Sequence, residues 1–202
     1  MITGEQLEKL AREYQTSLFP NTIREYYQHI FLEYLYQVPE ADQLLFKGGT
    51  ALRIVYGSPR FSEDLDFSLF GVLPERVKTF VEGLFITVLE NLERRGIHIS
   101  LSPKSGVTTG GYFGLASLTM TGFQPVTIAM NISVRPKEKL RGEVETIAGD
   151  FTSTYALIHL PQEMIVEEKV FGALLERKKP RDFYDLYFMM RKNMLSSGQK
   201  NG

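Results

Sequence analysis

Apolar residues recur along this chain at two different spacings, and the change from one to the other outlines the expected secondary structure. Spacings of three and four residues predict helices, and they cover residues 3–18, 23–38, 74–95, 163–177 and 181–192. Alternation of apolar and polar residues predicts strands, at residues 64–70, 97–101, 112–120 and 125–136, the last two as a hairpin. Mixed helices and strands of this kind predict an α+β fold.

Local signals mark where several of these elements begin and end. Thr3 and Gln6 fit a capping box that opens the first helix. Pro20 and Pro39 are placed to end the first two helices, and Gly96 is placed to end the helix before it. The segment of residues 102–111 is expected to be a loop because it is rich in Gly, Ser and Thr.

The domain organisation follows from a change of pattern in the last third of the chain. Gly149 and Pro161 indicate a linker there, and helical periodicity follows it. The sequence therefore predicts a core over residues 1–148, which includes an N-terminal helical pair, and a C-terminal helical segment over residues 149–202. In that segment Ile165, Val166, Val170, Leu174 and Leu175 are expected to point inward.

Composition narrows the class of protein. The 202 residues are 43% hydrophobic and 23% charged, with a net charge of −1, which is ordinary for a globular protein. The absence of cysteine excludes a disulfide framework and a thiolate nucleophile or zinc site. The N-terminus is charged and no apolar run approaches the length of a membrane span, so we expect a soluble, cytoplasmic protein without a membrane partner. The three histidines match no metal-ligand spacing.

A double glycine follows a short apolar run and precedes a helical stretch. Gly48 and Gly49 interrupt the apolar residues 44–46, and the residues after them suit a helix with Thr50 at its N-cap. Glycines allow a phosphate to approach backbone N–H groups at a helix start. The pattern therefore favours a phosphate cradle, although an ordinary turn would look the same.

Two aspartates follow about fifteen residues later, on a predicted strand. In the sequence DLDFSLF, Asp64 and Asp66 project to one face because strand side chains alternate. Two like charges on one strand repel each other unless they are solvated or bridged by a cation. The pair therefore predicts a site for Mg²⁺, with a solvated strand face as the alternative.

Two separated segments carry a resemblance to a known family. The sequences KGGTALRIVYGSPRFSEDLDF and EEKVFGALLERKKPRDFYDLYFM resemble the AbiEii-type nucleotidyltransferase toxins of abortive-infection and type IV toxin–antitoxin systems. The resemblance implies a nucleotidyltransferase-like mixed β-sheet flanked by helices, an NTP substrate, Mg²⁺, and transfer of a nucleotidyl group to an acceptor such as RNA or a tRNA end. It also implies a cognate antitoxin from a neighbouring gene, with direct binding left open.

The same resemblance assigns roles to individual residues. Asp64 and Asp66 would hold the metal, and Lys169 and Asp182 would complete the catalytic group from the C-terminal helices. The expected nucleotide-binding residues are Gly48, Gly49, Thr50, Ser62 and Lys169. The candidate supporting residues are Arg60, Asn131, Arg181 and Asp185. Asp185, three residues from Asp182 on one helix face, is expected to hydrogen-bond Arg181 or Lys169 rather than bind metal.

One position departs from the family pattern. The predicted strand TIAMNIS has Asn131 where this fold usually supplies a third carboxylate. A neutral amide cannot act as a general base and binds Mg²⁺ more weakly than a carboxylate. Either Asp182 takes part of that role, or the register differs, or activity is weakened. A small-molecule acceptor such as an aminoglycoside, a non-catalytic nucleotide- or partner-binding descendant, and a plain structural domain remain alternatives.

Basic residues are concentrated at two places in the second half of the chain. The first group is Arg135, Lys137, Lys139 and Arg141, and the second is the KKPR segment of residues 178–181. Each group suits either a solvated surface or contacts to substrate phosphates.

Overall fold

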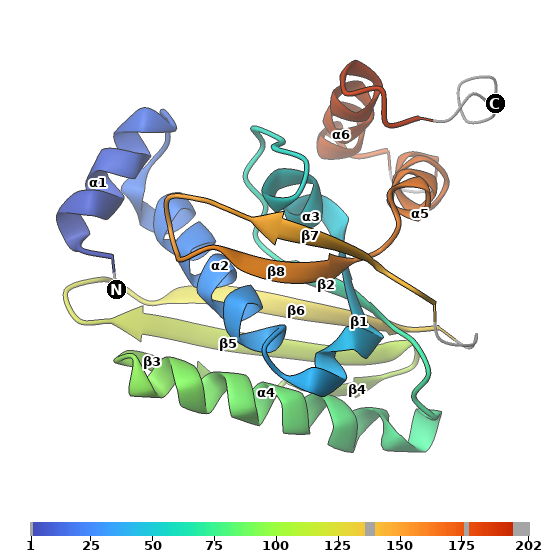
Figure 1. Ribbon diagram of the computed structural model, residues 1–202, viewed down its shortest axis with the longest axis horizontal. Helices are drawn as coiled ribbons and strands as arrows, with labels where there is room; N and C mark the ends of the chain where they lie inside the picture. Colours follow the sequence, from blue (N-terminus) through green and yellow to red (C-terminus); the bar gives the residue numbers. More distant parts are fainter. Residues whose placement is uncertain (1, 136–139, 176–177, 196–202) are drawn as a thin grey trace.

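A single mixed β-sheet organises the molecule (Figure 1). The computed structural model describes residues 2–135, 140–175 and 178–195. Within this part of the chain the strand order is β3-β5-β6-β2-β1-β8-β7, and β4 pairs with β5. The strands are β1 (Leu44–Lys47), β2 (Leu65–Leu69), β3 (Ile97–Leu101), β4 (Gly106–Thr108), β5 (Gly111–Met120), β6 (Val126–Val134), β7 (Glu143–Ile147) and β8 (Tyr155–His159).

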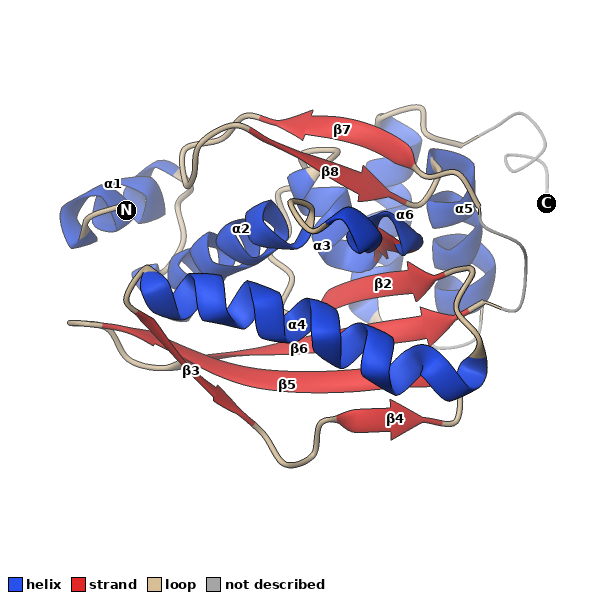
Figure 2. Ribbon diagram, turned by 60° about the horizontal axis from the view of Figure 1, so that its bottom comes forward, coloured by secondary structure: helices blue, strands red, loops and turns tan. Residues whose placement is uncertain are grey.

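Helices cover both faces of this sheet (Figure 2). They are α1 (Gly4–Glu13), α2 (Ile23–Leu35), α3 (Gly48–Ile54), α4 (Val77–Arg94), α5 (Gln162–Glu167) and α6 (Pro180–Arg191). A π-helical segment, Glu168–Leu174, continues α5. The mixed sheet flanked by helices confirms the predicted fold class.

Two apolar clusters lie on opposite faces of the sheet. The larger one joins the apolar side chains of α2 and α4 to Phe46, Phe67 and Ile132 of the central strands. The smaller one joins α3, α5 and α6 through residues such as Leu52, Ile165 and Phe188. Neighbouring residues of a strand point to opposite faces, so the polar residues between these apolar positions face the C-terminal helices.

Some predicted elements differ from the observed ones near their ends. The capping box of Thr3 and Gln6 is present, but α1 ends at Glu13 instead of residue 18. The helix after the double glycine begins at Gly48, with Lys47 as its N-cap, so the prediction that Thr50 caps it is wrong. The expected loop of residues 102–111 contains β4.

The prediction of a linker before the C-terminal helices is also wrong, because β8 lies between Gly149 and Pro161. β7 and β8 form a hairpin, and β8 pairs in parallel with β1. Four of the five residues of β7 are exposed, so this edge strand has no apolar face that a sequence pattern could reveal. The sheet therefore continues beyond residue 148, where the sequence placed the end of the core.

The inward residues of the C-terminal segment are only partly as expected. Ile165 and Val166 are buried, whereas Leu175 is 57% exposed, contrary to the prediction. The side chain of Leu174 lies outside the described set, as do Lys137 and Lys139 of the basic run. Leu175 follows the π-helical segment, whose wider turn changes the helical phase on which its predicted orientation depended.

Candidate active site

Three polar residues lie side by side across the central strands. Lys47 of β1 pairs in register with Asp66 of β2, and Asp66 pairs with Asn131 of β6. The Asn131 Nδ2 donates a hydrogen bond to Asp66 Oδ1 at 3.0 Å. The residues before Lys47 and after Asp66 are buried apolar side chains on the other face. The predicted placement of Asp66 and Asn131 on one face of the sheet is thus confirmed, and Lys47 joins them.

Asp64 stands just before β2, where its surroundings disfavour its charge. Burial raises the pKa of its carboxyl, and the nearby negative charges of Asp66 and Glu63 raise this pKa further. The positive charge of Arg181, at the start of α6, acts in the opposite direction. The Thr50 hydroxyl donates a hydrogen bond to the Asp64 carbonyl at 2.5 Å, which ties α3 to the strand.

The loop before these aspartates is held from α2. The Gln28 Nε2 donates to the carbonyls of Ser62 and Glu63 at 3.1 and 3.0 Å. Arg53 forms a buried ion pair with Glu25, and its guanidinium lies 3.7 Å from the centre of the Phe61 ring. These contacts fix the backbone that leads into Asp64.

The double glycine makes room for side chains of the protein itself. Gly48 has a φ of +82°, and a Cβ there would lie 2.2 Å from Asp66 Oδ2. A Cβ on Gly49 would lie 2.6 Å from Arg60 Nη2 and 2.8 Å from Ser62 Oγ. The two glycines therefore permit the close packing of Asp66, Arg60 and Ser62, and a phosphate-binding role for this turn stays a prediction.

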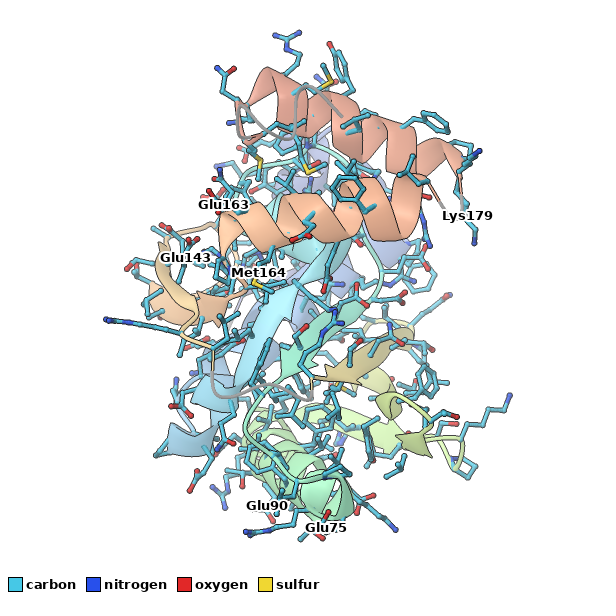
Figure 3. The ribbon with its side chains drawn as sticks, turned by 90° about the vertical axis from the view of Figure 1, so that its right-hand side faces the viewer. Glu75, Glu90, Glu143, Glu163, Met164 and Lys179 are labelled. Atoms are coloured by element: carbon cyan, nitrogen blue, oxygen red, sulfur yellow. The ribbon has the colours of Figure 1, made fainter. Side chains whose placement is uncertain are left out.

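A charged cleft of about 800 Å³ opens beside this turn. It lies between the strand ends and the α5 region, which Figure 3 shows beneath α6. Its charged lining residues are Lys47, Asp66, Arg135, Glu167, Glu168 and Lys169. Asp66 and Lys169 line this one cleft although they are far apart in sequence. The sequence also placed Asp64 and Asp182 in the cleft of Lys169, but neither of them is among its lining residues.

Glu168 connects two cations of the sheet to the C-terminal segment. Its carboxylate forms an ion pair with Lys47 at 3.0 Å and a second one with Arg135. Burial lowers the pKa of Lys47, and the charge of Glu168 opposes that shift. An anion in this cleft would find both cations already positioned, with Glu168 as its competitor.

Asp185 likewise pairs with two cations, Lys169 and Arg60. This buried carboxylate accepts a hydrogen bond from Lys169 Nζ at 2.7 Å. It also accepts a bidentate pair from Arg60, at 2.8 and 3.0 Å. The prediction that Asp185 bonds Lys169 or Arg181 is confirmed through Lys169, while Arg60 takes the second position.

Asp182 has a hydrogen bond at the start of α6. Its Oδ2 accepts from the backbone N–H of Lys179 at 3.1 Å, and its side chain is buried. Asp182 and Asp185 share one inward face of α6, as their spacing predicted. A role of Asp182 in catalysis stays a prediction.

Comparison with known proteins decides the family. The model of the family "Nucleotidyl transferase AbiEii toxin, Type IV TA system" matches residues 30–199. This chain belongs to that AbiEii family. It is a nucleotidyltransferase by this membership, and the resemblance inferred from the two sequence motifs is confirmed. No match was found among curated proteins.

Solved structures share the fold of this AbiEii protein. A candidate nucleotidyltransferase from Helicobacter pylori has a TM-score of 0.61 and 22% identity, over 88% of this chain and 72% of that one. The nucleotidyltransferase toxin MenT4 from Mycobacterium tuberculosis has a TM-score of 0.61 and 19% identity, over 84% of this chain and 58% of its own length. JHP933 from H. pylori has a TM-score of 0.57 and 22% identity, over 97% and 71%.

The site of this AbiEii chain fits the expected Mg²⁺ by its donor set. Mg²⁺ is commonly held by one or two carboxylates together with substrate phosphates and water, and Asp64 and Asp66 provide two. Burial and then the negative charge of Asp66 raise the pKa of Asp64, and a divalent cation would relieve the second effect. Among the described residues no cluster of three or more His, Cys, Asp or Glu forms a metal site, so substrate oxygens would complete the coordination.

Sequence reasoning missed Lys47 and Glu168, which form an ion pair in the cleft of this AbiEii chain. Lys47 could have been found, because it is a charged residue that ends a buried strand directly before the double glycine. Glu168 carries no such signal, since an acid beside Lys169 on a helix is ordinarily a solvated charge. Its role depends on Lys47 and Arg135, which are distant in sequence.

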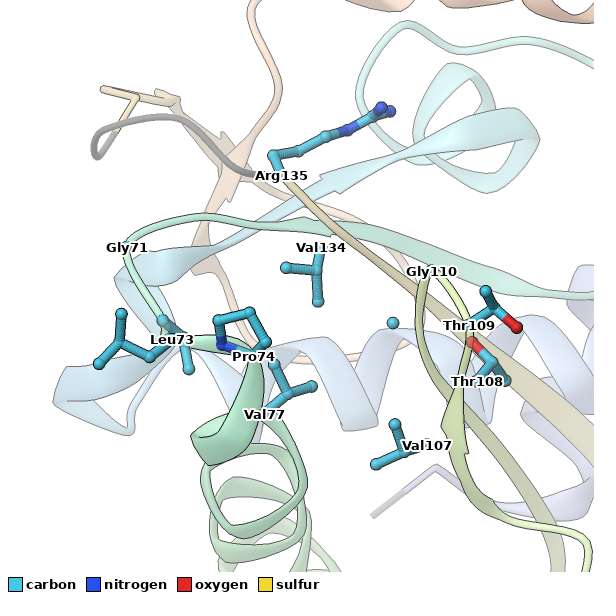
Figure 4. A pocket seen from close by; sticks show the side chains of 12 residues that line it. Gly71, Leu73, Pro74, Val77, Val107, Thr108, Thr109, Gly110, Val134 and Arg135 are labelled. Carbon is cyan, nitrogen blue, oxygen red and sulfur yellow. The ribbon is translucent and has the colours of Figure 1, made fainter.

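A second, more apolar cleft of about 530 Å³ shares Arg135 with the charged one. Val72, Leu73, Pro74, Val77, Val107 and Val134 contribute its apolar lining, with the turn of residues 108–111 beside them. In Figure 4 the Arg135 side chain extends away from Leu73 and Val107. Arg135 therefore stands between an apolar cleft and a charged one.

None of the described helices has the length and apolar composition of a membrane span.

Proposed function

We propose that this AbiEii protein transfers a nucleoside monophosphate from an NTP to an RNA acceptor, such as a tRNA end, in a Mg²⁺-dependent reaction. The observation that supports the proposal is the row of Lys47, Asp66 and Asn131, of which Lys47 and Asp66 line the cleft, with Asp64 directly before the same strand as Asp66. The row combines a cation for phosphates with carboxylates for a metal. We further propose that the protein is a cytoplasmic toxin, restrained by an antitoxin from a neighbouring gene and active in phage defence.

The proposed reaction is an in-line displacement at the α-phosphorus. The acceptor hydroxyl oxygen forms a bond to this phosphorus while the bond to the bridging oxygen breaks, and pyrophosphate leaves with that electron pair. When bound, Mg²⁺ supplies neutralisation of the phosphate charge. Lys47, Arg135 and Lys169 attract the triphosphate into the cleft. The hydroxyl proton passes to water, and Asn131 takes no part in this step because a neutral amide cannot accept a proton.

Asn131 has a positioning role in this proposal. Its amide donates to Asp66 Oδ1, which leaves Oδ2 of the same carboxylate directed toward Gly48. The substitution of a third carboxylate by Asn131 is thus compatible with activity, since the amide orients Asp66 instead of binding metal strongly itself.

The first test is transfer of label from each α-³²P-labelled NTP to total RNA with Mg²⁺. We predict that Asp64→Asn and Asp66→Asn each lower transfer at least about 100-fold, because each removes a metal-ligand charge while it keeps the side-chain shape. Glu63→Gln is the matched control, since the Glu63 side chain is 75% exposed. Thermal unfolding would show that the variants are folded, and expression in cells should show relief of growth arrest.

Near wild-type transfer by either aspartate variant would contradict the metal assignment. Release of pyrophosphate without labelling of RNA would favour the second candidate, transfer to a small molecule, for which the 530 Å³ cleft beside Arg135 is the supporting observation. Absence of Mg²⁺-dependent pyrophosphate release with every NTP and acceptor would favour a non-catalytic descendant. An aminoglycoside screen separates the acceptor classes.

A further inference from the structure

The outer surface of α6 has exposed charges of one sign only. Between residues 178 and 193 the exposed charged residues are Lys178, Lys179, Arg181, Arg191 and Lys192. The two acids of this stretch, Asp182 and Asp185, are 2% and 1% exposed. Because the whole chain has a net charge of −1, this basic surface is a local feature and attracts anionic partners.

Aromatic rings lie among these cations. Phe183, Tyr184 and Tyr187 are 53%, 39% and 55% exposed. Phe183 and Tyr187 are four residues apart and so form one ridge of the helix, with Tyr184 beside it. Arg191 donates a hydrogen bond to the Tyr187 hydroxyl at 3.1 Å, which places a cation at the edge of this ridge. We call this set of cations and rings the α6 face.

The α6 face is joined to the candidate active site. Figure 3 shows α6 as the outermost element on its side of the molecule, with Lys179 near its start. From the opposite side of the same helix, Asp185 holds Lys169 of the cleft and Arg60 beside Gly49. The α6 face is therefore tied to the cleft through Asp185 and Lys169, and the α5 segment lies between α6 and the cleft.

Nucleic acid is the partner that this combination fits best. Single-stranded nucleic acids bind where cations meet the phosphates and exposed rings stack on the bases, and such stacking tolerates any base. A duplex would not offer its base faces to Tyr184 and Tyr187. A face meant for protein burial alone would gain little from its three exposed lysines, since lysine is depleted at protein interfaces.

We propose that the α6 face binds the single-stranded part of the acceptor RNA and leads its end to the cleft that holds Asp66. This inference rests on the proposed function for the identity of the acceptor. The contacts that we propose do not depend on the catalytic assignment. Bases stack on Phe183, Tyr184 and Tyr187. Phosphates are contacted by Lys178, Lys179, Arg191 and Lys192.

The test is binding of a fluorescent single-stranded RNA of about 12 nucleotides to the full chain carrying Asp66→Asn, so that transfer does not interfere. We expect Tyr184→Ser with Tyr187→Ser to weaken binding at least about 25-fold, as each stacked base contributes at least about fivefold. Tyr187→Phe should keep the affinity because the ring remains. Lys178→Gln with Lys179→Gln should reduce the slope of log K against log salt by about 1.4, at about 0.7 for each phosphate contact.

The matched control changes charge and apolar exposure on other helices. Lys9→Gln with Arg12→Gln removes two exposed cations of α1, and Ile86→Ser removes an apolar side chain of α4 that is 55% exposed. All three substitutions should leave RNA affinity unchanged. An equal loss in these controls and in the α6 variants would overturn the inference, because binding would then be non-specific.

Transfer assays separate this inference from the proposed function. RNA labelling that falls in the α6 variants while pyrophosphate release with water or a small acceptor persists supports the inference. RNA labelling that is unchanged in the same variants overturns the inference and leaves the proposed function intact. Wild-type protein that never labels RNA refutes the proposed acceptor, and absence of RNA binding by the Asp66→Asn protein then overturns the α6 face as well. Loss of antitoxin binding with unchanged RNA binding also overturns it.

Discussion

Buried polar residues on α2 show how single side chains of this protein depend on their surroundings. His29 is 7% exposed, its Nδ1 lies 3.0 Å from the Tyr155 hydroxyl, and its ring stacks on Phe151 with ring centres 5.2 Å apart. Burial lowers its pKa to about 4, and the positive charge of Arg53 acts in the same direction. The folded protein therefore holds this histidine neutral.

This neutral histidine predicts a loss of stability in mild acid. The pKa is about 6.5 in the unfolded chain and about 4 in the folded protein. Below pH 6.5 the unfolded chain takes up a proton that the folded protein does not, so unfolding becomes easier until about pH 4. The contribution of His29 to the free energy of unfolding is fully present above pH 6.5. By about pH 4 the loss of this contribution reaches about 3 kcal/mol. Denaturant unfolding at pH 7.5, 6 and 5 measures it.

His29→Gln should make this pH dependence shallower, because glutamine does not titrate in that range. His98→Gln is the control, since the side chain of His98 is 73% exposed, and it should leave the dependence unchanged. If His29→Gln and wild type lost stability in parallel as the pH fell, the burial argument for His29 would fail.

The turn between β1 and α3 is the element that shapes the site. Its backbone leaves β1 at Lys47 and enters the helix at Gly48, where φ is positive and Asp66 lies close. A side chain at this position would meet a conformational penalty and a steric clash at once. Gly57 also has a positive φ, but no atom lies within 4 Å of the position that its Cβ would occupy.

Alanine substitutions at these two glycines should separate the cost of backbone strain from the cost of a steric clash with Asp66. Gly57→Ala should destabilise the protein by about 1 kcal/mol, from the left-handed backbone alone. Gly48→Ala should cost more than this in the free energy of unfolding and should also lower transfer at least about tenfold, because Asp66 must move. Unfolding and transfer assays on both variants provide the measurement. Equal effects of the two substitutions would show that Asp66 is not constrained by the turn.

At the scale of the whole molecule, ion pairs join the sheet, the loop before β2 and the C-terminal helices. Glu168 holds Lys47 of β1 and Arg135 beyond β6. Asp185 of α6 holds Arg60 of the loop and Lys169 of the π-helical segment. Both carboxylates thus connect layers that otherwise meet through the smaller apolar cluster.

Removal of Asp185 should therefore loosen the C-terminal helices. Asp185→Ala leaves two largely buried cations without their partner, and we expect a loss of about 3 kcal/mol in the free energy of unfolding. Asp182→Ala is the matched substitution of a buried aspartate on the same helix. It should cost about 1 kcal/mol in the free energy of unfolding through the lost capping bond. The proposed catalytic role of Asp182 predicts that this variant loses more of its transfer rate than Asp185→Ala does. The opposite pattern of stability and rate would exchange the roles of the two residues.

The sequence by itself determined the elements whose apolar faces are buried and the polar positions that alternate with them. The periods of α2, α4 and β6 predicted their burial, and alternation placed Asp66 and Asn131 on one face. These features are local, because helix and strand geometry fixes which residues of a segment share a face. The family motifs added Lys169, Asp182 and Asp185, which periodicity would leave as surface charges.

Only the tertiary structure decided the strands without an apolar face and the partners of the charged residues. β7 is an exposed edge strand, and only its backbone pairing with β8 identifies it as a strand. Arg60 and Asp185 are 125 residues apart, and Lys47 and Glu168 are 121 apart. From the sequence alone any acidic residue could pair with any basic one, because an ion pair requires closeness in space and no particular separation in sequence. The packing of the C-terminal helices against the sheet brings these particular groups together.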